Sequence, residues 1–253
     1  METVGAYAAF AVVGLVVGSF NNVVAYRVPA GESVVEPPSH CPVCATQLKA
    51  SDLVPVLSFV VLGGRCRYCR APIPFVYPLM EIATALLFVL AFWRFGWSGE
   101  LGVALPLFAL LTIVTHTDAR LKRIPDAITI PGMVYFAFVR LLYHPLPWQD
   151  YVFGFFAAGG LLLLIAVTSR GGMGGGDIKL MALAGLALGW QQSLLAFALA
   201  TLSGGVVGTF LLLTGKVDRK DTLAFGIFLA IGIVCAYVWG EQMWQSYWHD
   251  RLL

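Results

Sequence analysis

The sequence predicts an all-α, polytopic membrane protein with about eight transmembrane helices and a small cytoplasmic zinc-knuckle insertion. Of its 253 residues, 59% are hydrophobic and only 12% are charged. Apolar segments long enough to cross a bilayer recur along the chain, and most of the cysteines fall in one polar stretch. This balance excludes an ordinary soluble domain. The net charge of +2 says little about partners. The apolar segments make the lipid bilayer the expected surrounding, and no nucleic-acid partner is expected.

The first apolar segment is predicted to be a retained helix rather than a cleaved signal. No basic residue precedes it, and no cleavage site of small residues follows it. Asn21 and Asn22, near its end, would be costly beside lipid and are predicted to face the interior of the helix bundle. In chain order, the predicted spans cover residues 4–25, 78–97, 101–117, 127–143, 151–168, 178–190, 193–214 and 223–240.

The positions of lysine and arginine predict the orientation of these spans. If the N-terminus lies outside the cytoplasm, most of the 16 Lys and Arg residues fall on the cytoplasmic side, as the positive-inside rule requires. Asp118 and Asp177 then lie at cytoplasmic helix ends. The chain divides into a first transmembrane helix (1–25), a cytoplasmic insertion (26–77) and a membrane domain (78–253).

Two pairs of cysteines mark the cytoplasmic insertion. Cys41 and Cys44 form one C-x2-C motif and, after 21 residues, Cys66 and Cys69 form another. Two hairpin knuckles of this kind present four thiolates to one tetrahedral Zn2+, which is structural because no position stays open for water. A reducing compartment argues against disulfides. A redox pair of C-x-x-C motifs and a disulfide-stapled loop are the alternatives.

Two aspartates at helix boundaries are candidates for catalysis. Asp118 ends one apolar segment, and Asp177 closes a glycine run that begins at Gly171. Aspartic hydrolysis needs two neighbouring carboxylates that share one proton, one accepting a proton from water and the other donating to the peptide oxygen. Glycines beside them would let the backbone approach an extended substrate and adopt positive φ.

These aspartates also have simpler interpretations. A carboxylate is favoured at a helix N-terminus by the helix dipole, and Asp118 has basic neighbours with which it could form a surface ion pair. A transporter is a rival class, because glycine-broken helices with an aspartate also line ion pathways, although near the bilayer midplane. A non-catalytic scaffold of a secretion or pilus machine is a third.

Several short motifs occur together along the chain: residues 18–29, the paired C-x2-C module, Pro55–Ser58, Tyr77–Glu81, Asp118 with Ile124–Asp126, and Gly174–Lys179. With these motifs the chain resembles the bacterial type IV prepilin peptidases, which are membrane aspartic proteases of the GxGD class. Gly174-Gly175-Gly176-Asp177 matches the pattern that gives the class its name.

The resemblance implies a protease of the bacterial inner membrane, with its active site and cysteine insertion facing the cytoplasm. Such enzymes cut the basic leader from prepilins and pseudopilins after a glycine. Asp118 and Asp177 would be the catalytic pair within the domain 78–253. Gly174, Gly176 and Lys179 would form the loop beside the substrate.

The resemblance also implies a second activity. Bifunctional members methylate the new N-terminal amine with S-adenosylmethionine, and the cysteine-bearing insertion is associated with that form. Glu81 is a candidate for methylation or substrate contact, or is a buried polar residue without such a role. The sequence assigns no residue to the methyl donor.

One element departs from the family pattern. Near the last span the family usually has Pro-Phe-Gly-Pro, whereas this chain has Ala224-Phe225-Gly226-Ile227. Both prolines are absent, so we expect a more regular start to the last helix.

Overall fold

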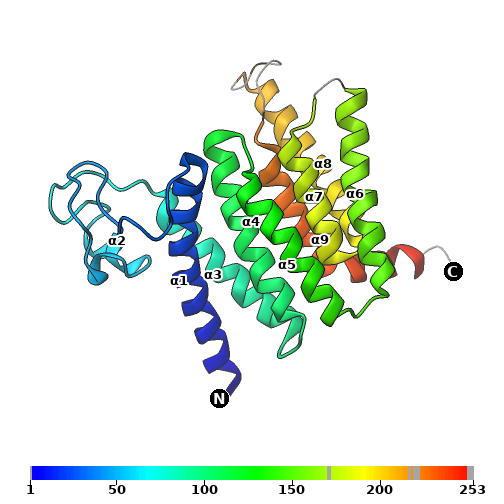
Figure 1. Cartoon of the computed structure of the whole chain (residues 1–253), viewed down its shortest axis with the longest axis horizontal. Helices are drawn as coiled ribbons and strands as arrows, with labels where there is room; N and C mark the ends of the chain where they lie inside the picture. The colour runs from blue at the N-terminus through cyan, green and yellow to red at the C-terminus, as the bar shows by residue number, and fades with distance from the viewer. Residues whose placement is uncertain (1, 170–171, 216–217, 219–222, 250–253) are drawn as a thin grey trace. The chain divides into compact units, whose positions relative to one another are not determined.

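The computed structural model describes residues 2–169, 172–215, 218 and 223–249, and in these residues the regular structure is helical apart from two isolated β-bridges (Figure 1). The chain divides into two compact units, residues 1–116 and 117–253, which are described in turn. The boundary falls inside helix α4 (Leu101–Leu121). Gly171, where the predicted glycine run begins, lies outside the described residues.

The first unit is built on α1 and α3, which pack closely against each other (Figure 1). A Cβ atom added to Gly18 would lie 2.7 Å from the Cα of Glu81, and one added to Gly14 would lie 2.6 Å from the Cα of Ala85. Small residues four apart allow this backbone contact between helices in a bilayer. The helices of the unit are α1 (Glu2–Ala30), η1 (Ala50–Asp52), α2 (Leu57–Val61), α3 (Val76–Phe95) and most of α4.

Two asparagines of α1 bind neighbouring helices. The Asn21 side-chain amide donates to Thr112 Oγ1 at 2.8 Å, and that of Asn22 donates to the Tyr77 carbonyl at 3.1 Å. Both side chains are buried. The prediction that they face the bundle interior is therefore confirmed, and each ties α1 to a different helix of the unit.

The polar insertion connects α1 to α3. The first helix continues five residues beyond its predicted end, to Ala30, and the chain then turns at Gly31 with φ +74°. The Arg27 guanidinium donates to the Ser33 carbonyl at 3.0 Å, which fixes the turn to the helix end. The insertion itself contains η1, α2 and the two isolated bridges.

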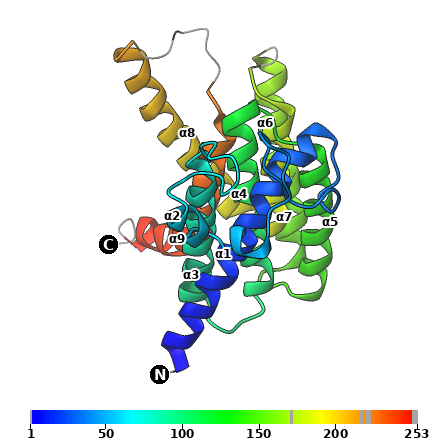
Figure 2. The same ribbon diagram turned by 90° about the vertical axis from the view of Figure 1, so that its left-hand side faces the viewer.

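In the part of the chain that the structure describes, the second unit consists of the last turn of α4 and five further helices. In it α5, α6 and α7 run side by side (Figure 1, Figure 2). The backbones of α6 and α7 touch at Gly154 and Gly185, where a side chain on either residue would meet the other helix. These helices are α5 (Asp126–Leu142), α6 (Trp148–Thr168), α7 (Gly175–Leu188), α8 (Trp190–Leu213) and α9 (Phe225–His249).

A buried arginine joins α5 to the C-terminal end of α7. The Arg140 Nε donates to the Ala187 carbonyl at 3.0 Å, and its guanidinium lies 4.7 Å from the centre of the Tyr151 ring. A cation is favoured at a helix C-terminus, where the carbonyls lack helical partners. Arg140 thus anchors the far end of the helix whose first turn carries Asp177.

Each of the eight predicted spans forms a helix, but not all of these helices are long enough to span a membrane alone. Six of them, in the described residues, have the length and hydropathy of a span: α1, α3, α4, α6, α8 and α9. The other two are shorter, with 17 residues in α5 and 14 in α7. The structure therefore supports six spans by length and composition. The segments predicted at 127–143 and 178–190 form the two short helices.

Candidate active site and metal centre

The four clustered cysteines come together in the insertion. The Sγ atoms of Cys41, Cys44, Cys66 and Cys69 all lie within 4.8 Å of one another. Those of Cys41 and Cys69 are 3.8 Å apart, which is the edge of a tetrahedron with metal–sulfur bonds of about 2.3 Å. All four are free cysteines, so the disulfide-stapled alternative does not describe this structure. The donor set fits one tetrahedral zinc ion.

Two equivalent turns shape this cluster. Antiparallel bridges join His40 to Gln47 and Arg65 to Pro72, so each C-x2-C motif sits in a short hairpin. Within each hairpin the residue after the second cysteine has positive φ, at Ala45 (+54°) and Arg70 (+61°). Its N–H donates to the carbonyl of the first cysteine, Cys41 or Cys66. These are the knuckles that the spacing predicts.

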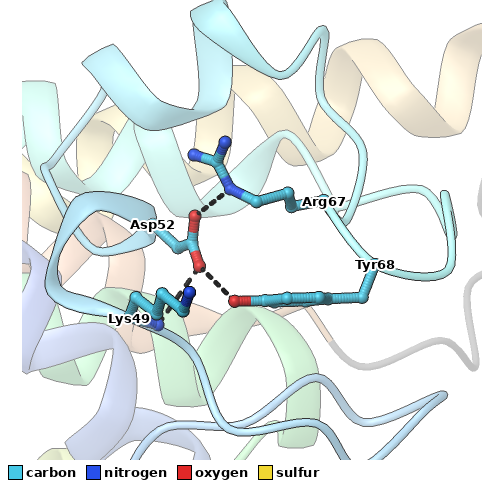
Figure 3. A network of polar contacts seen from close by, with 4 residues as sticks. All are labelled: Lys49, Asp52, Arg67 and Tyr68. Atoms are coloured by element: carbon cyan, nitrogen blue, oxygen red, sulfur yellow. Dashed lines mark hydrogen bonds and ion pairs between the residues drawn. The ribbon is translucent and has the colours of Figure 1, made fainter.

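Asp52 connects the segment between the knuckles to the second knuckle, as Figure 3 shows. Its Oδ1 accepts a hydrogen bond from Arg67 Nε at 2.6 Å, and its Oδ2 accepts from the Tyr68 hydroxyl at 3.2 Å and the Lys49 backbone N–H at 3.1 Å. The hydrogen bond from Arg67 holds the pKa of Asp52 below its ordinary value. Sequence reasoning missed this residue, because a lone aspartate in a loop gives no distinguishing signal.

Asp118 and Asp177 both belong to the second unit and lie at helix ends. Asp118 is in the last turn of α4 and is buried, and Asp177 is in the first turn of α7. They are close enough for the charge of Asp118 to act on the Asp177 carboxyl. A helix-end position for both is what a protease at the membrane surface requires, whereas a transporter needs its carboxylate near the midplane.

The glycines before Asp177 serve close packing rather than unusual backbone angles. A Cβ on Gly176 would lie 2.8 Å from the Ile124 Cβ, and one on Gly174 would lie 2.9 Å from Asp177 Oδ2. Gly174 precedes α7 with φ −70°, and none of the described glycines between 172 and 176 has positive φ. The expected positive φ is therefore wrong for these residues, because Gly175 and Gly176 are already helical.

Further contacts within the second unit hold together the two sequence motifs that contain Asp118 and Asp177. Lys179 Nζ forms an ion pair with both oxygens of Asp126, at 2.6 and 2.7 Å. Asp126 begins α5. The loop after Asp118 and the first turn of α7 are thus joined by one apolar contact, between Ile124 and Gly176, and by this ion pair.

Gly226, at the start of α9, is a residue whose role sequence reasoning missed. Its backbone N–H donates to Asp118 Oδ2 at 2.8 Å. The sequence pointed to this element only as a departure from a family pattern. No sequence signal shows that a helix start 108 residues away meets Asp118.

Glu81 lies in the first unit, on α3, and is buried. Its Oε2 accepts a hydrogen bond from the Val56 N–H at 2.7 Å, and its carboxyl also interacts with Ser19 of α1. Val56 has φ +60°, an uncommon angle for a β-branched residue. Glu81 therefore holds the end of the insertion against α1 and α3.

Comparison with known proteins gives matches along most of the chain. Residues 12–95 match the profile of the bacterial peptidase A24 N-terminal domain, and residues 105–209 match that of the type IV leader peptidase family. The second match contains Asp118, Asp177 and the glycine run. No solved structure matches the chain.

Several curated relatives, each named prepilin leader peptidase/N-methyltransferase, are similar over nearly their whole length. The protein of Bacillus subtilis is 38% identical, covering 92% of this chain and 94% of the relative. That of Pseudomonas putida is 36% identical, covering 93% and 91%. That of Neisseria gonorrhoeae is 32% identical, with the same coverage of 93% and 91%.

Proposed function

The chain belongs to the type IV leader peptidase family, and from this we propose that it cleaves the leader peptide from prepilins or pseudopilins and N-methylates the new N-terminus. This proposal rests on one observation, the pairing of Asp118 with Asp177. They are 59 positions apart in the sequence, interact electrostatically, and both lie in the segment that matches the peptidase family.

The proposed cleavage uses both carboxyl groups and one water molecule. One aspartate, ionised, takes a proton from water as the water oxygen attacks the peptide carbonyl carbon. The other, protonated, donates its proton to the carbonyl oxygen. Two neighbouring carboxylates cannot both ionise easily, so the pair supplies one acid and one base together.

The position of the pair suits a substrate that lies partly in the bilayer. An apolar pilin segment would stay among the lipid tails, while its basic leader remains in water. We propose eight spans, with α5 and α7 included, an N-terminus outside the cytoplasm, and a cytoplasmic position for the aspartates and the insertion. The clustering of Lys and Arg supports this orientation. The proposed location is the bacterial inner membrane.

The insertion and the first unit are proposed to serve the methyl transfer. Cys41, Cys44, Cys66 and Cys69 would hold a structural zinc ion that folds the insertion. S-adenosylmethionine, when bound, supplies the methyl group. Glu81 lies where the insertion meets α1 and α3 and is proposed to contact the amine that receives it. The division of the chain into a first transmembrane helix (1–25), the insertion (26–77) and a membrane protease domain (78–253) is also proposed.

The test is cleavage of a prepilin by purified protein in detergent micelles. Asp118→Asn and Asp177→Asn keep the side-chain shape but remove the acid–base chemistry, and each should lower kcat by roughly a thousandfold or more. Asp150→Asn is the matched control, because Asp150 also lies in the first turn of a helix. If either dyad variant cleaves like the parent, that aspartate is only a helix cap or an ion-pair partner.

Methylation is measured separately, with a pilin supplied already cleaved. Asp118→Asn should methylate this substrate at the parental rate, since no peptide bond has to be broken. Glu81→Gln should slow methylation but leave cleavage of the intact prepilin unchanged. A parent protein that transfers no methyl group would rule out the second activity.

A further inference from the structure

The first turn of α9 meets Asp118 through its backbone. The Gly226 N–H donates to Asp118 Oδ2 at 2.8 Å in a buried hydrogen bond, and the Ile227 N–H also interacts with this carboxyl. The first N–H groups of a helix have no partner within the helix. Here they are directed at a residue of another helix, in a part of the chain beyond the matched segment 105–209.

The absence of a side chain at position 226 makes this contact possible. A Cβ built on Gly226 would lie 2.8 Å from Asp118 Oδ2, 3.1 Å from its Cγ, and 3.1 Å from the Ile124 Cδ1. Real Cβ atoms almost never approach heavy atoms so closely. Any larger residue would push the carboxylate away from the start of α9.

We propose that Gly226 and Ile227 are positioning residues that hold Asp118 as the ionised member of the pair, so that Asp118 is the general base and Asp177 the acid. This inference rests on the proposed function. Backbone N–H groups donate to a carboxylate and favour its charged form, and the positive end of a helix dipole acts in the same direction.

The charged groups around the two aspartates support this assignment. Lys122, the residue that follows the end of α4, adds a favourable positive charge at Asp118. Asp177 is the acidic group that faces Asp118 from α7, and it has one backbone donor, the N–H of Gly174. Asp118, with two backbone donors and a cation, therefore has the stronger support for a negative charge.

Ile227 gives this chain a donor that a proline could not supply, because proline has no N–H. Substituting Ile227→Pro would remove that N–H from the first turn of α9, where proline is tolerated. Gly226, lacking a Cβ, also reduces the steric clash that proline causes with the residue before it. The substitution therefore tests the donor with little change to the helix.

The experiment compares Ile227→Pro with Ile227→Val, which keeps the N–H, using the full chain in detergent and an intact prepilin. Cleavage is followed from acidic to neutral pH. Loss of this donor to the Asp118 carboxylate should shift the acidic limb of the kcat profile to higher pH by about one unit. At low pH the cleavage rate should therefore fall about tenfold. KM should not change, and Ile227→Val should match the parent. A profile for Ile227→Pro that superimposes on the parent's overturns the inference.

Gly226→Ala provides a second, independent variant. It should lose at least about tenfold in cleavage while methylating a pre-cleaved pilin normally, which shows that the chain is folded. Gly205→Ala is its control, since a Cβ there meets nothing within 4 Å, and it should cleave normally. Parental cleavage by Gly226→Ala also overturns the inference. If Asp118→Asn is inactive while Ile227→Pro and Gly226→Ala cleave like the parent, the positioning role fails and the proposed function stands. If Asp118→Asn cleaves like the parent, the proposed function itself fails.

Discussion

Lys179 Nζ lies 2.6 Å from Asp126 Oδ1, and this ion pair joins the two sequence motifs that contain Asp118 and Asp177. Lys179 is two residues after Asp177 in α7, and Asp126 is the first residue of α5. The contact connects two segments of the second unit that are distant in sequence. It gives both residues a role in placing the aspartates.

Breaking this ion pair should affect cleavage more than stability. Lys179 and Asp126 are partly exposed, with side-chain exposures of 40% and 56%, so the pair contributes less than about 1 kcal/mol to the free energy of unfolding. Lys179→Met and Asp126→Asn should each slow prepilin cleavage several-fold, with thermal unfolding nearly unchanged. The double variant Lys179→Asp/Asp126→Lys should recover part of the lost rate. No recovery would show that the two residues act separately.

Loss of one cysteine should release the metal and unfold the insertion without disrupting the membrane helices. Purified parent protein should contain about one zinc ion per chain, because four thiolates complete a tetrahedral site. Cys41→Ser should contain none, and should show increased proteolysis between α1 and α3 with unchanged helix content by circular dichroism. Cys235→Ser, a change in α9 outside both C-x2-C motifs, is the control and should keep its zinc. A parent without zinc would exclude the metal site.

Adding a single methyl group between α1 and α3 should destabilise the first unit. Gly18→Ala would place a Cβ 2.7 Å from the Glu81 Cα, so the two helices must separate. Overpacking of this kind costs roughly 1–3 kcal/mol. Gly5→Ala, on the same helix, meets nothing within 4 Å and should leave the unfolding temperature in detergent unchanged. Equal temperatures for the two variants would contradict the close packing.

The sequence predicted those features that depend on composition and on local spacing. Apolar runs identified the six long helices and the two shorter ones, α5 and α7, because burial in lipid demands continuous hydrophobic segments. The two C-x2-C motifs identified the knuckles, because tetrahedral coordination restricts the spacing of its ligands. The sequence also predicted a short segment at 178–190, where the structure has the 14 residues of α7, but the hydrophobic pattern alone counted this segment as a span.

Features that depend on distant packing were not predictable. Gly226 meets Asp118 across 108 positions, and nothing in either local sequence specifies that meeting. Asp52 likewise gains its role only when Arg67 and Tyr68 fold back onto it. The glycine run suggested unusual φ angles. In the structure, Gly176 instead leaves the space that the Ile124 side chain occupies. Such roles follow from which surfaces touch, and a single sequence does not show this.

If α7 spans the membrane as proposed, its shortness has a consequence for the surrounding lipid. A helix of 14 residues is about 21 Å long, while the hydrocarbon core of a bilayer is about 30 Å thick. A helix that spans with such a deficit is matched by local thinning of the membrane or by headgroups drawn inward. Water would then reach Asp177, in the first turn of α7, below the level of the surrounding headgroups. The activity of the proposed protease would accordingly depend on acyl-chain length, so that thicker bilayers oppose hydrolysis even when every residue of the site is intact.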